Sequence, residues 1–105
     1  MGIDQAFAAL ADPVRIEIVT RLSRGPASVS EIAEPYAMSL RGILKHVQVL
    51  EDAGLVVTVK EGRVRRCELQ SRRLDEATRW LERVRHRWER RMDRLEEYAK
   101  EEGTR

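Results

Sequence analysis

The sequence has 105 residues, of which 42% are hydrophobic and 36% charged, and its formal net charge at pH 7 is +2. A chain of this length forms one domain with a modest core, which such chains often complete by dimerising. The single cysteine excludes an intramolecular disulfide and a thiolate-rich metal site. We find no signal peptide and no apolar run long enough to span a membrane, so the cytoplasm is the expected location.

Two helices are predicted near the start of the chain. Residues 3–11 form the first, whose apolar residues are spaced by four and three: Ile3, Phe7 and Leu10. Asp12 and Pro13 are typical of a new helix start, with Asp as N-cap and Pro in the first turn. The second helix is expected to be mostly buried through five apolar residues: Val14, Ile16, Ile18, Val19 and Leu22. Its exposed residues are expected to include Arg15 and Arg21.

A third, short helix is predicted from the capping-box pattern of Ser28 and Glu31, and it runs toward Pro35. The free N–H groups and hydroxyls at its start could instead meet a phosphate. We favour a plain helix cap over a phosphate contact.

A fourth helix is predicted from Ser39 as N-cap to Gly54 as the terminating residue. Its buried face is expected to carry four apolar residues: Leu40, Ile43, Val47 and Leu50. Arg41, Lys45 and Gln48 lie on the opposite side. With the third helix this forms a predicted helix-turn-helix, and a helix with one buried and one cationic face suits the DNA major groove. The alternative is a surface helix whose charges are only solvated; the flanking elements favour DNA.

A basic β-hairpin is predicted next. Residues 55–60 and 63–70 form its strands around a turn at Glu61-Gly62. Its inner face is expected to bring together four residues: Val57, Val59, Cys67 and Leu69. Four cations crowd its tip: Lys60, Arg63, Arg65 and Arg66. A charged edge strand that blunts aggregation would look similar, but beside a helix-turn-helix we favour a wing that contacts DNA.

Positive charge is concentrated in this part of the chain. Residues 39–73 contain eight Lys and Arg against four Asp and Glu, whereas residues 74–102 contain eight basic and nine acidic residues. A local cationic excess is expected where a protein contacts phosphates.

One long final helix is predicted over residues 74–102, without Gly or Pro. Its apolar residues follow a near-heptad seam with one stutter: Leu74, Ala77, Leu81, Val84, Trp88, Met92, Leu95 and Ala99. The small core before it cannot cover so long a seam, which predicts a dimerisation helix that packs with Phe7 of the first helix. The near-balanced charge argues against the alternative, a helix lying on an anionic membrane.

Several sequence motifs of this chain resemble those of a known protein family. In chain order they are Phe7-Ala-Ala-Leu-Ala-Asp12-Pro13-Val-Arg15-Ile, Ser30-Glu31-Ile32-Ala33, Met38-Ser39, Lys45-His46-Val47, Leu50-Glu51-Asp52-Ala53-Gly54-Leu55-Val56, and Gly62-Arg63 followed by Leu69. In this order and spacing the chain resembles the ArsR/SmtB family of bacterial winged-helix repressors over roughly its first seventy residues. The long arginine-rich final helix is similar to a metal-independent branch. The resemblance implies a homodimer that represses transcription at a palindromic operator until an effector releases it.

The chain departs from the family pattern at its metal-binding positions and at one DNA-facing position. Metal-sensing members carry a Cys-x-Cys cluster where this chain has residues 27–30, Ala-Ser-Val-Ser. On the final helix His86 and Asp93 are seven residues apart, roughly 10 Å along the axis, too far to share one ion within a subunit. No metal site is therefore expected. The family often has a small polar residue at position 44, where Leu44 would either pack inward or contact a thymine methyl group.

One histidine, the cysteine and the two tryptophans remain as single candidate residues. His46 is expected to be a satisfied, half-buried histidine rather than a ligand, and Cys67 a core hydrophobe rather than a redox switch. Trp80 and Trp88 are expected to pack at an interface; a pocket for an effector is the alternative.

The predicted fold is mostly α with a small β-hairpin: a winged helix-turn-helix over residues 1–72 and a dimerisation helix over 73–105. The predicted function is a homodimeric repressor that binds double-stranded DNA. A small-molecule effector is implied by the family resemblance alone. The DNA-contacting residues of helix 39–52 and wing 60–66 would be Ser39, Arg41, Leu44, Lys45, Gln48, Lys60, Arg63 and Arg65. The dimer interface would be Phe7, Leu81, Val84, Trp88, Met92 and Leu95.

A winged-helix adaptor that binds an acidic protein is the alternative function. An enzyme is the least favoured class, because no catalytic constellation or cofactor motif occurs at workable spacing.

Overall fold

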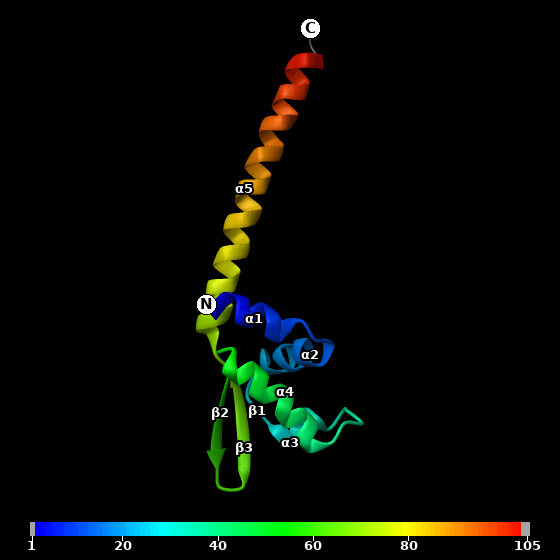
Figure 1. Cartoon of the computed structure of the whole chain (residues 1–105), viewed down its shortest axis with the longest axis vertical. Coiled ribbons are helices and arrows are strands. Elements are labelled where there is room, and N and C mark those ends of the chain that lie inside the picture. The colour runs from blue at the N-terminus through cyan, green and yellow to red at the C-terminus, as the bar shows by residue number, and fades with distance from the viewer. Residues whose placement is uncertain (1, 104–105) are drawn as a thin grey trace.

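The computed structural model of the chain describes residues 2–103. Its first two helices lie side by side in the middle of the molecule, between the long final helix and the β-hairpin (Figure 1). Helix α1 spans Gly2–Leu10 and α2 spans Pro13–Leu22. The carboxylate of Asp12 accepts hydrogen bonds from the backbone N–H groups of Val14 and Arg15, at 2.9 and 3.3 Å. The predicted N-cap is confirmed, and the aspartate satisfies two of the orphan donors at this helix start.

The buried face of α2 is narrower than predicted. Ile18 and Leu22 are buried, but Ile16 is half exposed, because two residues along a helix turn a side chain to nearly the opposite face. The prediction that Arg15 and Arg21 are exposed is also wrong: both are half-buried.

The helix-turn-helix consists of α3, Val29–Ala33, and α4, Leu40–Asp52. The predicted capping box is present: Ser28 Oγ accepts from the N–H of Glu31 at 3.1 Å, and the Glu31 carboxylate accepts from the N–H of Ser28 at 3.0 Å. Ser39 caps α4 by accepting from the N–H of Gly42 at 3.1 Å. Gly54, at φ +77°, supplies the left-handed residue that follows the helix, as predicted.

Three of the four residues predicted on the inner face of α4 form the centre of the core. Ile43, Val47 and Leu50 are almost completely buried. Leu40 is not, since 55% of its surface is exposed. It is the first residue of α4, and the chain entering the helix leaves it open to solvent.

A three-stranded antiparallel sheet in the order β1-β3-β2 completes the globular part. Strand β2 spans Val56–Glu61, β3 spans Val64–Leu69, and Gly62 turns the chain between them at φ +64°. The short strand β1, Ala27–Ser28, was not predicted; it is held by pairing with β3, which lies far away in the sequence.

The register of the hairpin differs from the prediction by one residue. Cys67 pairs with Thr58, and Leu69 pairs with Val56, whereas Val57 and Val59 lie opposite Glu68 and Arg66. Because side chains alternate along a strand, this shift moves both valines off the inner face. Cys67 is completely buried, as expected of a core residue.

Helix α5, Ser71–Gly103, extends away from the globular part (Figure 1), and the molecule as a whole measures 74 × 26 × 22 Å. It begins three residues before the predicted start. Its first turns pack on α1: Ala77 is buried, and Trp80 contacts Phe7 edge to face with ring centroids 5.6 Å apart. Within residues 2–103, no helix combines the length and hydropathy needed to cross a bilayer.

Candidate nucleic-acid interface

The outer face of α4 is polar and exposed. Arg41, Lys45 and Gln48 are all exposed and recur at intervals of four and three residues, which places them on the side away from the buried face. Ser39, at the start of the helix, is also exposed. The helix therefore presents long hydrogen-bond donors to solvent from Arg41 to Gln48.

The wing places three further cations beside this helix. Lys60 and Arg65 are direct cross-strand partners, and Arg63 follows the turn at Gly62. Lys60 and Arg65 share a face of the hairpin with Thr58 and Cys67, because residues two apart on a strand lie on the same side. This is the face that meets the core farther down the hairpin.

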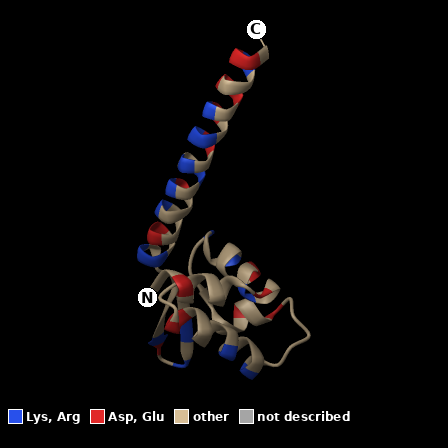
Figure 2. Ribbon diagram, turned by 45° about the horizontal axis from the view of Figure 1, so that its top comes forward, with Lys and Arg blue, Asp and Glu red and all other residues tan. Residues whose placement is uncertain are grey.

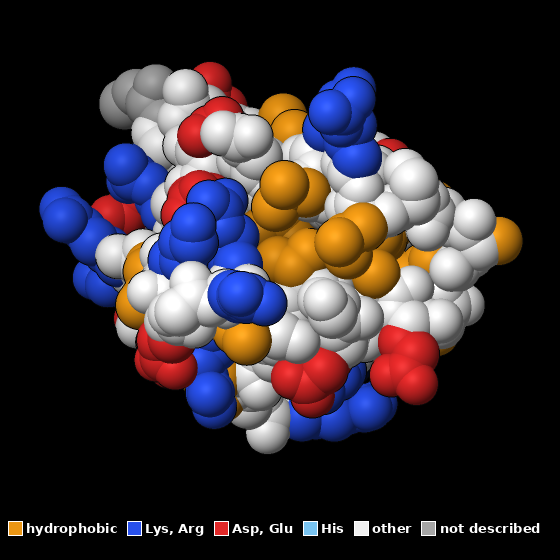
Figure 3. Space-filling view, turned by 90° about the horizontal axis from the view of Figure 1, so that it is seen from below, with side chains coloured by type: hydrophobic (Ala, Val, Ile, Leu, Met, Phe, Trp, Pro, Cys, Tyr) orange, Lys and Arg blue, Asp and Glu red, His pale blue; other side chains and the backbone are white. Residues whose placement is uncertain are grey.

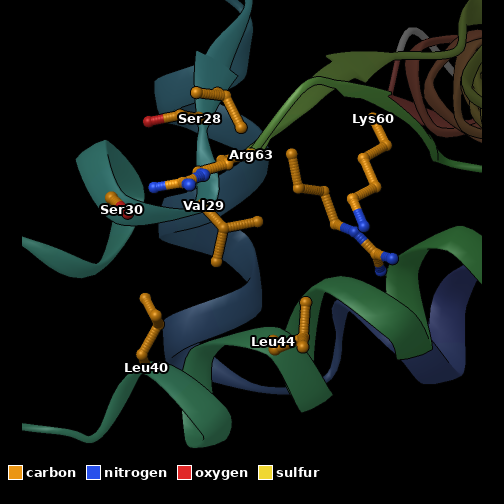
Figure 4. A pocket seen from close by; sticks show the side chains of 9 residues that line it. Ser28, Val29, Ser30, Leu40, Leu44, Lys60 and Arg63 are labelled. Carbon is orange, nitrogen blue, oxygen red and sulfur yellow. The ribbon is translucent and has the colours of Figure 1, made fainter.

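A groove of about 400 Å³ lies between the wing and α4. The wing contributes Lys60, Arg63 and Arg65, and α4 contributes Leu40 and Leu44 (Figure 4). The structure thus brings together at one groove four of the residues that the sequence predicted for DNA contact. Leu44 is half-buried, and Leu40 joins it from the position predicted to be in the core.

The start of α3 forms the third side of the groove, through Ser28, Val29 and Ser30 (Figure 4). The capping box engages the N–H groups of Ser28 and Glu31, as the plain-cap interpretation predicted. The hydrogen bond from the Ser28 N–H lowers the pKa of the Glu31 carboxyl below its ordinary value.

The cations of the groove and of α4 have no carboxylate partners among residues 2–103. Within the described part of the chain, no salt bridge involves Arg41, Lys45, Lys60, Arg63 or Arg65. On α5, by contrast, basic and acidic residues alternate, and ion pairs form along the helix (Figure 2). Cations without intramolecular partners are free to neutralise phosphates.

Two contacts fix the orientation of α4. On the wing side, the Glu51 carboxylate accepts from the hydroxyl of Thr58 at 2.6 Å and from its backbone N–H at 3.2 Å. On the other side, Arg15 Nη1 lies 3.2 Å from His46 Nδ1, while Arg15 Nε donates to the carbonyl of Ala9 at 2.6 Å. His46 is half-buried and has a partner, as predicted.

Sequence reasoning missed the roles of Arg15 and Thr58. Only 18% of the Arg15 side chain is exposed, and it connects α1, α2 and α4. Neither contact has a local sequence signal, because each partner lies on a different element.

The end of the molecule opposite α5 carries this interface. Seen from that end, hydrophobic side chains gather in the middle of the face, with Lys and Arg beside them (Figure 3).

Among residues 2–103, no three His, Cys, Asp or Glu side chains lie close enough together to hold a metal ion.

These elements define the chain as a winged helix-turn-helix protein: α3 and α4 form the helix-turn-helix, and β2 and β3 form the wing. Residues 10–59 match the family model described as a helix-turn-helix domain.

Comparison with solved structures shows the protein family to which this chain belongs. The chain is similar to a crystal structure of an ArsR family transcriptional regulator, with 43% identity, coverage of 84% of this chain and 91% of that one, and a TM-score of 0.78. An ArsR-like transcriptional regulator from Rhodococcus sp. RHA1 is 37% identical over 93% of this chain and 92% of that one, with a TM-score of 0.77. The chain belongs to the ArsR family of transcriptional regulators.

A curated relative matches over a shorter stretch. The HTH-type transcriptional regulator Rv2034 of Mycobacterium tuberculosis is 43% identical over 53 residues, which cover 50% of each chain. The match therefore spans about half the length of that relative.

Proposed function

We propose that this chain is a transcriptional repressor that binds duplex DNA as a homodimer. The observation that carries the proposal is the groove between α4 and the wing, lined by cations that have no carboxylate partner within residues 2–103. In this proposal α4 enters the major groove, and the wing contacts the backbone or the adjacent minor groove.

Seven of the eight residues predicted to contact DNA have a polar or charged role in this arrangement. Arg41, Lys45 and Gln48 contact base edges or phosphates from the outer face of α4, and Ser39 lies at the rim. The wing cations neutralise phosphates: Lys60, Arg63 and Arg65. Base contacts supply sequence specificity, whereas phosphate contacts supply affinity that depends on salt.

The seam of α5 supports the homodimer. Leu81, Val84, Trp88, Met92 and Leu95 are each between 44% and 57% exposed. An apolar stripe of this length marks an interaction surface. A second copy of the helix would cover it, with Phe7 of α1 beside the seam through its contact with Trp80. We keep the division into a DNA-binding part, residues 1–72, and a dimerisation helix, residues 73–105, as part of this proposal.

Two-fold symmetry then predicts the form of the operator. Two copies of α4 related by a dimer axis read two half-sites of a palindrome, with centres about one DNA turn apart, roughly 34 Å. Repression follows if such an operator overlaps a promoter, and an effector would act by changing the spacing of the two copies of α4.

The proposal is tested by fluorescence anisotropy with a labelled duplex from upstream of the gene and a scrambled duplex, across a salt series. We expect tighter binding to the native duplex, with one dimer per site. Arg41→Ala and Lys45→Ala should each weaken binding, and a lost phosphate contact lowers the salt slope by about 1. Arg90→Ala is the matched control, since it removes the same charge from an exposed position on α5. Equal effects of all three variants, or no binding to either duplex at low salt, would contradict the proposal; the second result would favour the protein-binding adaptor.

A further inference from the structure

The floor of the groove between α4 and the wing is apolar, although it faces solvent. Leu40 is 55% exposed, and Leu44, one turn later on α4, is half-buried; both line the groove. We call these two side chains the apolar floor. Figure 4 shows Leu40 and Leu44 one turn apart on α4, both pointing into the groove toward Val29.

The surroundings of the apolar floor indicate what covers it. Lys60, Arg63 and Arg65 form a cationic rim along one side of the same groove. An occupant must therefore combine a strongly anionic border with an apolar group at its centre. Duplex DNA fits this description, because its phosphates border a major groove in which one base, thymine, presents a methyl group.

The position of the floor within α4 fits the same occupant. Leu40 is the first residue of α4, and Leu44 lies one turn later. The N-terminal residues of a recognition helix are those that reach base edges. The donors of the outer face, such as Arg41, can read polar base edges, but they gain nothing from a methyl group.

We infer that Leu44 and Leu40 make this protein select thymine, by packing against its C5-methyl group in the major groove. The inference rests on the proposed DNA-binding function and names the base that this part of the site reads. Leu44 is the main specificity-determining residue, and Leu40 extends the contact to a neighbouring base step.

The test removes the methyl group and nothing else. A duplex is first selected from a random pool with the full-length chain. Each thymine of one half-site is then replaced in turn by 2′-deoxyuridine, which keeps every hydrogen-bonding group. We expect about a fourfold loss of affinity at one or two positions, the amount that burial of a single methyl group contributes. 5-Methylcytosine in place of cytosine at the other positions should leave affinity unchanged.

Protein variants then assign the contact to its residue. We call the loss of affinity on replacing thymine by 2′-deoxyuridine the uridine penalty. It should disappear in Leu44→Ala and become smaller in Leu40→Ala. It should persist in Ile16→Ala, which truncates an exposed aliphatic side chain on α2. Circular dichroism checks that each variant is folded, and the uridine series on the unmodified protein does not depend on any variant.

Three results would overturn the inference. If the chain binds the selected duplex but no thymine shows a penalty, DNA binding stands and the reading of thymine fails. If the penalty persists in both leucine variants, another residue reads the methyl group. If no duplex is bound at low salt, the proposed function itself fails, and the groove instead accommodates an acidic protein with an apolar anchor.

Discussion

The carboxylate of Glu51, in the last turn of α4, accepts a 2.6 Å hydrogen bond from the hydroxyl of Thr58 on β2. The same oxygen accepts from the Thr58 backbone N–H, which lies on the edge strand of the sheet. A side chain of the helix thus satisfies a strand donor that has no neighbouring strand. This contact sets the angle between α4 and the wing, and therefore the width of the groove between them.

Thr58→Val should loosen that connection without changing charge or shape. We expect the free energy of unfolding to fall by about 1 kcal/mol, because one hydroxyl donor to a half-buried carboxylate is lost. Urea denaturation followed by circular dichroism measures the change. Thr58→Ser keeps the hydroxyl and is the control; equal destabilisation by serine and valine would show that the methyl group, not the hydrogen bond, matters.

Arg15→Met should destabilise the globular part more strongly. The variant keeps the aliphatic stem but loses the hydrogen bond to the carbonyl of Ala9 and the contact with His46. Since the donor is charged and mostly buried, we expect a loss of about 2 kcal/mol in thermal or urea unfolding. Arg24→Met, at an exposed position, should change stability by less than about 0.5 kcal/mol. Similar values for the two variants would contradict the structural role of Arg15.

Trp88→Glu should convert the proposed dimer to a monomer, because it introduces a charge at the middle of the exposed seam. Sedimentation equilibrium measures the association. His86→Glu provides a matched control: it adds the same charge only two residues away, on nearly the opposite face of α5. A dimer that survives Trp88→Glu would place the interface elsewhere.

Stability should depend on the Glu31 carboxyl at acid pH. The hydrogen bond from the Ser28 N–H holds the pKa of Glu31 below its ordinary value of 4.5. A carboxyl with a lowered folded-state pKa stabilises the fold above its unfolded-state pKa, and that contribution is lost as the pH falls through the folded-state value. Glu31→Gln should therefore show a flatter decline in unfolding midpoint below pH 4.5 than the unmodified protein. Parallel declines would exclude the capping box as a source of acid sensitivity.

Cys67 should react slowly with alkylating reagents while the protein is folded. Burial raises the pKa of its thiol, the charge of Glu51 raises it further, and no part of the side chain reaches solvent. Labelling with iodoacetamide at pH 8, followed by mass spectrometry, should be slow in buffer and fast in denaturant. Rapid labelling of the folded protein would reveal an opening of the sheet that the structure does not show.

The local sequence was sufficient to predict most element boundaries. Asp12 with Pro13, Ser28 with Glu31, and Ser39 are caps whose hydrogen bonds reach only two or three residues along the chain. The seam of α5 was likewise visible from its spacing. These caps and this spacing depend only on residues that are neighbours in the sequence, so they can be predicted without the tertiary structure.

Only the tertiary structure decided where non-local contacts fall. The register that pairs Cys67 with Thr58 depends on how β2 leaves α4, and a shift of one residue reverses which side chains face inward. Leu40 satisfies the same helical spacing as Ile43, but its exposure depends on the chain around it in space. The sequence by itself thus determined the winged helix-turn-helix and its cationic faces. The groove with an apolar floor and a cationic rim arises from packing between α3, α4 and the wing, which lie apart in the sequence and meet only in the fold.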